Sequence, residues 1–279
     1  MATGVEDIAV SIVLYQTDTE ELSLCLGDLE ACGVRQVYLI DNSPTDKLKS
    51  IAKKYRHIVA EYFHMEKNVG YGAAHNVALR KSMSLRREYH LVLNSDIRIP
   101  SADALQKIVA FMDENPQVGQ LTPRMEYPDG SLQYNVRMLP TPMNLILRRF
   151  FPKWIGQKKD TLYQLAFWNH LSSANVPYHQ GSFLFLRVSA LYKVGLFDER
   201  FFMYPEDIDL TRRIHRVCET LYWPEVTVVH AHKAASYKNG RMMRIHAWNM
   251  IKYFCKWGWI FDSERKRFNR QLLASLQQK

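Results

Sequence analysis

The chain has 279 residues and a mass of 32.7 kDa, with 47% apolar and 23% charged residues. This composition supplies enough apolar sequence for a sizeable core, and it excludes the disordered, collagen-like and low-complexity classes of protein. Four cysteines without a C-x-x-C pair exclude a zinc ribbon and a disulfide scaffold, and they favour a reducing, cytoplasmic setting.

The ends of the chain differ in charge. Residues 1–7 carry two acids and no basic region, and eighteen consecutive apolar residues occur nowhere, so neither a cleaved leader nor a membrane span is predicted. The formal net charge is +9, and residues 241–279 supply most of it, with nine Lys and Arg against two Asp and Glu. We expect this basic tail to face water or an anionic partner.

Short β-branched apolar runs alternate with helix-period stretches through the first 115 residues. The pattern predicts four pairs of a strand and a helix, at 8–14 and 20–32, 36–41 and 44–55, 58–63 and 70–84, and 90–94 and 101–115. Such repeats form right-handed crossovers and a mostly parallel sheet that is covered on both faces. The ligand crevice of such a sheet lies beyond the carboxyl ends of its strands. Polar residues that follow the strands are therefore candidate site residues.

After about residue 116 the regular alternation stops, and several prolines interrupt the chain. We predict a strand at 178–187, a helix at 205–218 with an apolar face, and a strand at 226–230. No internal repeat is present. The expectation is a mixed second half.

Polar groups follow each of the first two predicted strands. The first strand leads into Tyr15-Gln16-Thr17-Asp18, and the second ends in Asp41-Asn42-Ser43-Pro44. An aspartate at this position can accept the ring N3–H of a uracil or thymine, with Tyr15 against the base. The same residues also suit an ordinary turn that caps the next helix, and this interpretation stays open.

The segment Asn68–Asn76, with glycines at 70 and 72, opens a predicted helix directly after the third strand. A helix N-terminus offers unpaired N–H groups to an anion such as a diphosphate. The segment is neither a Walker A loop nor a G-x-G-x-x-G motif. Tight packing between helix and strand is the alternative explanation for the glycines.

The fourth strand leads into Asn94-Ser95-Asp96. A carboxylate at the crevice edge can hold a divalent cation that bridges two phosphates and neutralises a departing diphosphate. A helix-capping role near Pro100 is the alternative for Asp96.

Three acids, Glu206, Asp207 and Asp209, lie at the start of the helix predicted from residue 205. Capping explains one or two of them. A dense run of aromatic residues precedes them, at positions 197, 201, 202 and 204, and an apolar wall raises the basicity of a neighbouring carboxylate. Such a carboxylate can act as a general base on a hydroxyl nucleophile.

In this order the segments resemble the family 2 glycosyltransferases with the GT-A fold, particularly bacterial enzymes of surface polysaccharide biosynthesis, including rhamnosyltransferases. The resemblance covers roughly residues 8–236. It implies an α/β fold with a mostly parallel, Rossmann-like central sheet flanked by helices. The implied GT-A domain spans 1–236, with a nucleotide-binding half at 1–115 and an acceptor and catalytic half at 116–236. A basic, aromatic helical extension follows at 237–279.

The resemblance also assigns roles to single residues. It places Asp41 at the nucleotide base with Tyr15 and Thr17 near it, and Asp207 as the catalytic base beside Glu206. The remaining implied nucleotide-binding residues are Asn68, Gly70, Asn76, Asn94 and Ser95.

Asp96 takes the last position of the family's D-x-D metal motif, and Asn94 takes the first. Asn94 departs from the family pattern because it removes a charged ligand. The resemblance implies Mg²⁺ or Mn²⁺ held by Asp96 and diphosphate oxygens, with His230 as a further ligand. An ordinary hydrogen-bonded role is the alternative for His230.

The implied function is inverting transfer of a sugar from a nucleoside-diphosphate sugar to a hydroxyl of a saccharide or lipid-linked saccharide in cell-surface polysaccharide synthesis. The motif style favours dTDP-rhamnose as the donor. A catalytically degenerate sugar-nucleotide-binding protein is one alternative, motivated by Asn94. A sugar nucleotidyltransferase is less suitable, because residues 16–21 are acidic and lack the glycine-rich basic loop that a triphosphate needs. No nucleic-acid-binding signature accompanies the basic tail, so nucleic acid is not an expected partner.

Two regions are left for the acceptor and its surroundings. The resemblance assigns residues 138–178 to shaping the acceptor site, although a pair of packing helices explains most of their side chains. In the tail, aromatic and basic residues interleave, which suits a helix lying in a membrane interface. A helical pair packed on the catalytic domain is the equal alternative. The expected location is the cytoplasm, at the inner face of the plasma membrane if the tail binds lipid.

Overall fold

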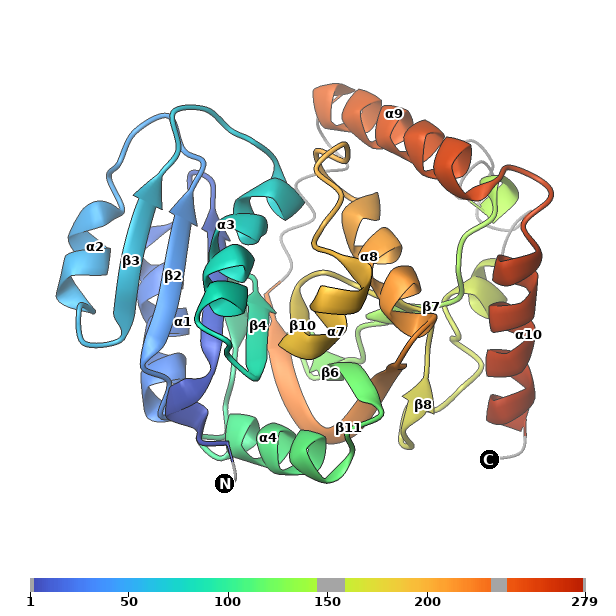
Figure 1. The fold of residues 1–279 in the computed structure, drawn as a ribbon, viewed down its shortest axis with the longest axis horizontal. Coiled ribbons are helices and arrows are strands. Elements are labelled where there is room, and N and C mark those ends of the chain that lie inside the picture. Colours follow the sequence, from blue (N-terminus) through green and yellow to red (C-terminus); the bar gives the residue numbers. More distant parts are fainter. Residues whose placement is uncertain (1–2, 145–158, 232–239, 278–279) are drawn as a thin grey trace.

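The computed structural model describes residues 3–144, 159–231 and 240–277, and one large sheet runs through it (Figure 1). Nine strands form this sheet in the order β3-β2-β1-β4-β10-β6-β11-β5, with β8 beside β11, and β7 pairs with β9 separately. The strands are β1 (Ala9–Leu14), β2 (Gln36–Asp41), β3 (Val59–His64), β4 (Tyr89–Leu93), β5 (Ile97–Arg98), β6 (Val118–Glu126), β7 (Val136–Arg137), β8 (Ala174–Asn175), β9 (Tyr178–His179), β10 (Phe183–Arg187) and β11 (Glu219–His230). The helices are η1 (Val5–Asp7), α1 (Thr19–Ala31), α2 (Lys49–Lys54), α3 (Tyr71–Ser84), α4 (Ala104–Glu114), α7 (Val188–Val194), α8 (Pro205–His215), α9 (Gly240–Trp257) and α10 (Ser263–Gln277).

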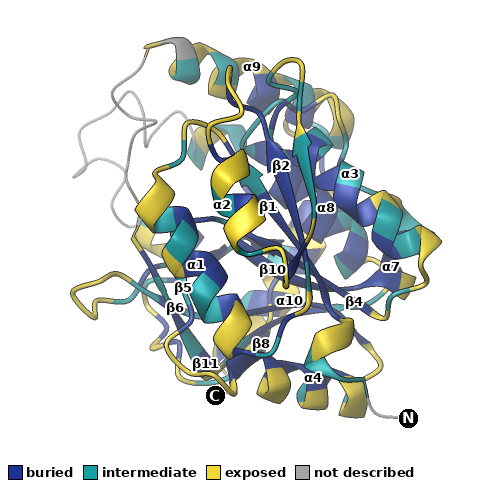
Figure 2. Cartoon of the chain, turned by 90° about the vertical axis from the view of Figure 1, so that its left-hand side faces the viewer, coloured by how far each residue is buried: buried dark blue, intermediate teal, exposed yellow. Residues whose placement is uncertain are grey.

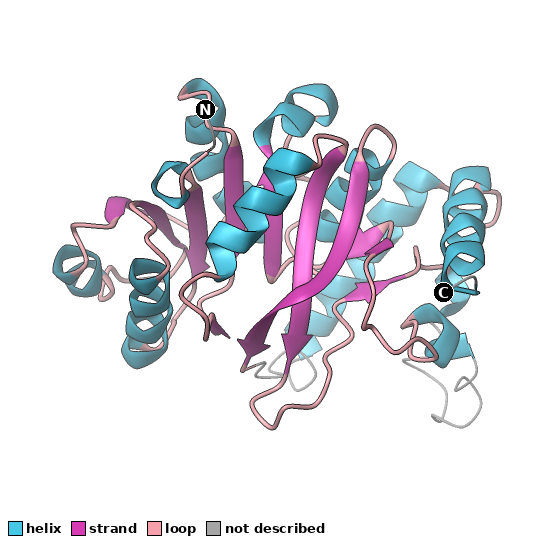
Figure 3. Cartoon of the chain, turned by 90° about the horizontal axis from the view of Figure 1, so that it is seen from below, coloured by secondary structure: helices cyan, strands magenta, loops and turns pink. Residues whose placement is uncertain are grey.

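The first half alternates strand and helix as the sequence predicts. β1 pairs in parallel with β2 and β4, and β2 pairs in parallel with β3. The helix α1 begins after Asp18, whose carboxylate accepts the N–H groups of Glu20 and Glu21 at 2.9 and 3.2 Å. Helices lie on both sides of the sheet (Figure 3). The predicted α/β fold class is confirmed.

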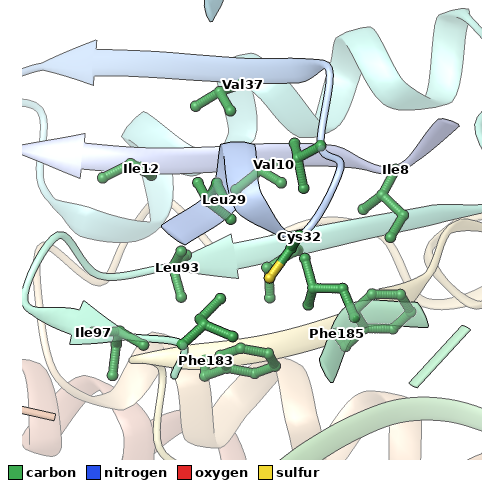
Figure 4. Close-up of a cluster of buried hydrophobic side chains, with 14 of the residues drawn as sticks. Ile8, Val10, Ile12, Leu29, Cys32, Val37, Leu93, Ile97, Phe183 and Phe185 are labelled. Atoms are coloured by element: carbon green, nitrogen blue, oxygen red, sulfur yellow. The ribbon is translucent and has the colours of Figure 1, made fainter. Parts of the chain in front are cut away.

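Apolar side chains hold the layers together. In Figure 4 the side chains of Val10 and Ile12 on β1 lie in one cluster with Leu29 of α1 and Phe183 and Phe185 of β10. The opposite face of the same strands is covered by α3, through its small residues at 74 and 78. Figure 2 shows the result: the central strands β4 and β10 are buried, whereas the edge strand β3 and the outer faces of the helices are partly exposed. Burial of this apolar surface is the main force that holds the crevice-bearing edge in place.

The second half of the sheet is mixed. β10 runs antiparallel to both β4 and β6, whereas β6 and β11 are parallel. The predicted strand at 226–230 is the last part of the longer β11. The strand β6 escapes prediction because Pro123 lies within it; Pro123 sits opposite Trp223, where the pairing with β11 shifts register.

Two predicted elements differ from those observed. The helix predicted at 44–55 is shortened to α2, because a turn closed by the bond from Lys49 N–H to Asp46 O precedes it. The strand predicted at 178–187 is two strands, β9 and β10, which belong to different sheets. They separate around Gly181, whose N–H donates to Asp207 Oδ2 at 2.8 Å instead of to a neighbouring strand. This interruption contributes to the site described below.

The C-terminal helices α9 and α10 pack on the rest of the protein. Tyr253 and Phe254 of α9 and Phe268 of α10 share a buried cluster with Phe201 and Ile208. The tail is therefore a packed helical pair, as one of the two interpretations predicted. The expected boundary at 236/237 lies outside the described residues. Among the helices that the structure describes, none combines the length and apolar character that a bilayer span requires.

Candidate active site

The turns after β1 and β2 leave the same edge of the sheet, because Leu14 and Asp41 are partners in the parallel pairing. A bond from Gln16 N–H to Ser43 Oγ at 2.8 Å joins the two turns. Tyr15 is exposed at this edge, and its N–H donates to Thr17 Oγ1 at 3.2 Å. The structure thus brings together the residues that the sequence assigns to the base.

Asp41 itself is fully buried. Its Oδ1 accepts the Ser43 N–H at 2.8 Å, and its Oδ2 accepts the Tyr62 hydroxyl at 2.5 Å. Asp41 therefore holds the turn, which is the structural role that the sequence left open for it. Each carboxylate oxygen of Asp41 keeps a further lone pair that could accept a hydrogen bond from a nucleotide base. The contact between Asp41 and a base stays a prediction.

The glycine loop lies where the two halves of the chain meet. Gly70 has a φ of +93°, and a Cβ there would lie 2.4 Å from Phe202 O, so only glycine allows this approach. The Gly70 N–H donates to Asn68 Oδ1 and the Tyr71 N–H to Phe202 O, both at 2.9 Å. Asn42 Nδ2 adds a bond to Gly70 O at 3.2 Å. These two N–H groups serve packing, as the alternative interpretation holds, and the diphosphate contact stays a prediction.

Asn76 has a structural role that differs from the predicted one. Its Nδ2 donates to Phe197 O at 2.9 Å and to Glu199 Oε1 at 3.0 Å, and its Oδ1 accepts the Phe197 N–H at 3.0 Å. Both amide hydrogens thus have partners in the segment that precedes α8. Asn76 therefore anchors α3 to that segment, and its contact with a nucleotide stays a prediction.

The loop after β4 divides its side chains between two directions. Ser95 Oγ donates to Glu21 Oε1 of α1 at 2.7 Å, away from the loop's neighbours on β10. The Asn94 N–H donates to Ser182 O, and its Oδ1 lies 2.8 Å from the Tyr71 hydroxyl. Asp96 is partly exposed. The Asn94–Asp96 loop therefore lies against the same junction as the glycine loop.

Asp96 and His230 form a pair that suits a cation. Asp96 Oδ1 lies 3.2 Å from His230 Nε2, and His230 Nδ1 lies 2.9 Å from Gln133 Oε1. The Gln133 contact on Nδ1 leaves Nε2 directed toward the carboxylate, and the two groups together can hold a cation. Among the described residues no group of three His, Cys, Asp or Glu forms a complete metal site, so any further ligands must come from elsewhere.

Glu206 and Asp207 begin α8 and are both buried. Asp207 accepts the N–H groups of Gly181 at 2.8 Å and Ile208 at 2.7 Å. Burial nevertheless raises the pKa of Asp207 to about 7. Burial and the neighbouring Asp207 charge raise the pKa of Glu206 well above its ordinary value. Burial and mutual repulsion therefore disfavour simultaneous ionisation of the two carboxylates.

Tyr71 joins the catalytic pair to the loop after β4. Its hydroxyl lies 2.8 Å from both Gly181 O and Asn94 Oδ1 and shares its hydrogen between them. Burial raises the pKa of Tyr71, and the charges of Glu206, Asp207 and Asp96 raise it further, so all three carboxylates lie within electrostatic range of this phenol. Tyr71 thus places the acid at 207 in one site with Asn94 and Asp96.

The segment that leads into α8 is strained and is held by α9. Tyr204 has a φ of +89°, which is costly for a residue with a side chain. Its ring stacks on His246 at 4.4 Å, and Asn249 Nδ2 donates to Met203 O at 3.0 Å. Lys252 Nζ donates to Arg200 O at 2.8 Å, one helical turn further along.

These contacts recur once per turn of α9, and they end with Lys256, whose Nζ lies 2.8 Å from Asp198 Oδ2. We call the four residues of α9, His246, Asn249, Lys252 and Lys256, the α9 clamp. Sequence reasoning missed them because contacts between the tail and residues 198–204 leave no local pattern. Tyr71 and Gln133 were missed as well; only Tyr71 lies within a segment that the sequence singles out.

The site combines a group that can abstract a proton with a pair of residues that can hold a cation. Asp207 is a carboxylate whose pKa suits a general base near neutral pH. Arg137 on β7 lies close enough to lower the pKa of Asp207, opposing the effect of burial. Across the Tyr71 bridge, Asp96 and His230 offer oxygen and nitrogen ligands to a cation.

Comparison with known proteins supports one family. The sequence profile of "Glycosyl transferase family 2" matches residues 30–194, well over half of the chain. The chain is 29% identical over 215 residues to the N-acetylglucosaminyl-diphospho-decaprenol L-rhamnosyltransferase of Mycobacterium tuberculosis, covering 72% of this chain and 67% of that protein. It is 25% identical over 230 residues to the rhamnosyltransferase WbbL of Escherichia coli, covering 79% of this chain and 82% of the relative.

Solved structures support the fold. The mannosyltransferase PcManGT from Pyrobaculum calidifontis, solved in complex with GDP-Man and Mn²⁺, superposes with a TM-score of 0.58 at 16% identity. The superposition covers 90% of this chain and 63% of that one. The expected GT-A fold is confirmed.

Proposed function

The chain belongs to glycosyl transferase family 2, and from this premise and the crevice geometry we propose that it is an inverting enzyme that moves a sugar from a nucleoside diphosphate to a saccharide hydroxyl. The observation that carries the proposal is the Tyr71 bridge. It joins Asp207, whose pKa is raised to about 7, to the loop that bears Asn94 and Asp96. The chain is a glycosyltransferase by family; the donor, acceptor and residue roles that follow are proposals.

The proposed donor is dTDP-rhamnose. Two relatives are named rhamnosyltransferases, and one of them is named for a lipid-diphosphate-linked acceptor. In this proposal Tyr15, Thr17 and Asp41 contact the pyrimidine at the edge beyond β1 and β2. The acceptor is a saccharide on a lipid carrier, as in cell-surface polysaccharide synthesis.

Asp96 and His230 are the residues that would hold a divalent cation, Mg²⁺ or Mn²⁺. Two observations support this role: Asp96 Oδ1 lies 3.2 Å from His230 Nε2, and Gln133 contacts His230 Nδ1. Such a cation supplies positive charge to the diphosphate oxygens. Asn94 would offer only a neutral oxygen at the position where the family has an acid, so the protein would supply less negative charge to the cation.

The protein's own residues carry the remaining chemistry. Asp207 takes the proton of the acceptor hydroxyl while that oxygen forms a bond to the anomeric carbon from one face. The bond from the anomeric carbon to the diphosphate oxygen breaks on the opposite face, which inverts the configuration. In this proposal Glu206, whose pKa burial and the Asp207 charge raise well above its ordinary value, keeps its proton, and Asp207 carries the charge. The Gly181 N–H and the Tyr71 bridge hold the base in position.

The test is release of nucleoside diphosphate from a panel of dTDP-, UDP- and GDP-sugars with a saccharide acceptor, with Mg²⁺ or Mn²⁺ and with chelator. We expect release from dTDP-rhamnose that the chelator abolishes. His230→Ala should lower the rate about 10- to 100-fold, as expected for the loss of a metal ligand or its support. His57→Ala, an exposed histidine paired with Glu30, is the control and should leave the rate unchanged. Donor binding without release would favour the degenerate sugar-nucleotide-binding protein instead.

A further inference from the structure

An apolar loop projects from the junction of α9 and α10. Trp259, Ile260 and Phe261 are consecutive and exposed, Ile260 by 71% and Phe261 by 91%. We call residues 258–262 the aromatic loop. On α9, Ile251 and Trp248 are also exposed, about two and three turns before the aromatic loop. No described segment covers this apolar surface.

The aromatic loop is held rigidly in its exposed form. Gly258 has a φ of +102°, and the buried Arg265 lies 3.5 and 3.3 Å from the carbonyl oxygens of Gly258 and Trp259. The Trp259 ring packs on Phe254 at 5.3 Å. These contacts fix residues 258 and 259, and the adjoining Ile260 and Phe261 face solvent.

A groove of about 840 Å³ adjoins the loop, between Pro142 and Met143 on one side and α10 on the other. Its lining includes Arg265, Lys266 and Arg270 and no acidic residue. The two acids of the tail are occupied elsewhere, since Asp262 and Glu264 both pair with Arg212. Lys266 and Arg270 have no acidic partner among the described residues, so the surface is both apolar and cationic.

We propose that the aromatic loop and this groove dock the protein on an anionic lipid bilayer. Ile260 and Phe261 enter the headgroup region, Trp259 lies at its level, and Lys266 and Arg270 contact lipid phosphates. A second copy of the chain fits less well, because two cationic surfaces repel each other. α9 lies across the end of the molecule toward which β2 and β3 point (Figure 1). The benefit of docking rests on the proposed function, in which the acceptor is lipid-linked.

Flotation with vesicles of mixed phosphatidylglycerol and phosphatidylcholine tests the proposal, with pure phosphatidylcholine vesicles and high salt as comparisons. The wild type should float with the anionic vesicles, and less so in high salt. The double variant Ile260→Ser with Phe261→Ser should lower the partition constant at least about tenfold, because two apolar anchors are lost. Lys266→Gln with Arg270→Gln should lower it about fivefold per charge on anionic vesicles only.

Two matched controls remove similar groups from other surfaces. Leu85→Ser with Leu171→Ser removes exposed apolar side chains, and Lys53→Gln with Arg56→Gln removes exposed charges. Both should float as the wild type does. Unchanged flotation of the loop variant, or equal binding to neutral vesicles, overturns the proposal. So does a dimer in sedimentation analysis that the loop variant abolishes, because the surface would then bind a second copy.

Activity keeps this proposal separate from the proposed function. With a lipid-free saccharide acceptor, the loop and charge variants should release nucleoside diphosphate at the wild-type rate. An inactive protein that still floats would contradict the proposed function and leave the docking surface standing. An active protein that does not float would contradict the docking surface alone.

Discussion

At the scale of single residues, two opposing effects set the pKa of Asp207. Burial makes its ionised form costly, while the N–H groups of Gly181 and Ile208 stabilise that form. The balance leaves the pKa near 7, where a carboxylate is both strong enough to take a proton and ionised often enough to act. Capping of α8 alone would have lowered this pKa instead.

The pH dependence of the reaction follows from this balance. Asp207 acts only when deprotonated, so kcat/KM should fall about tenfold for each pH unit below about 7 and level off above it. A rate profile with a lipid-free acceptor, measured from about pH 5 to 9, checks this limb. A profile that stays flat down to pH 5 would mean that an acid of ordinary pKa, or no base at all, limits the reaction.

Tyr71→Phe tests the bridge between the two parts of the site. The variant keeps the ring in contact with His75 and removes only the hydroxyl that faces Gly181 O and Asn94 Oδ1. Because the hydroxyl positions Asp207 through Gly181, we expect kcat to fall about 10- to 100-fold with donor KM nearly unchanged. The acidic limb of the pH profile should also shift. Tyr192→Phe, which removes an exposed hydroxyl bonded to Met83 O, is the control. Equal losses in both variants would show that the bridge has no special role.

At the scale of elements, the α9 clamp connects the tail to the catalytic segment. Asn249 is buried and holds Met203 O, directly before the strained Tyr204. Strain at this position persists only because neighbouring structure holds it. The clamp therefore makes α9 part of the catalytic unit.

Asn249→Ala should release this strain. The lost hydrogen bond costs about 1 kcal/mol of stability, whereas kcat should fall about tenfold because Asp207 lies three residues beyond Tyr204. Donor affinity, measured by thermal shift, should stay near the wild-type value. The control is Trp248→Ala, the adjacent residue on the exposed face of α9. A kcat unchanged in Asn249→Ala would remove α9 from the catalytic unit.

Elements with a strong local sequence pattern could be predicted. Features that depend on contacts between residues far apart in the sequence could not. Local patterns of a few residues predict the strands β1 to β4, the helices that alternate with them and the loops that follow these strands. The strand β6 was hidden by Pro123, and the break at Gly181 depends on Asp207, 26 residues away. The bonds between Asn76 and Phe197 were also hidden, because nothing in the segment around Asn76 reveals a partner 121 residues away.

At the scale of the whole molecule, the tail is tied to the catalytic half by one buried cation. Arg212 of α8 is 1% exposed; it contacts Asp262 at 2.8 and 2.6 Å and Glu264 at 2.8 Å. Its guanidinium also lies over the Trp257 ring at 4.1 Å. This attachment joins α8, which bears Asp207, to Asp262 of the aromatic loop and Glu264 of α10.

Arg212→Ala should lower the free energy of unfolding by about 3–5 kcal/mol, because it removes the closer of the two cations that pair with the buried Asp262, the other being Arg265 at 3.8 Å. Urea denaturation measures the loss. Arg216→Ala is the matched control, since Arg216 pairs with the same Glu264 but is 45% exposed. Its cost should stay below about 1 kcal/mol. Similar losses in the two variants would contradict the view that the buried pair attaches the tail.

The most direct measurement compares sugar transfer by wild type and Asp207→Asn at saturating donor, with donor affinity measured on the same preparations. Because the folded state disfavours ionised Asp207, stability is lost as pH rises through about 7, so Asp207→Asn should melt at or above the wild-type temperature at pH 8. The account predicts an intact variant that binds the donor as the wild type does and transfers at least about a thousandfold more slowly. Transfer by Asp207→Asn at a rate comparable to the wild type would contradict it.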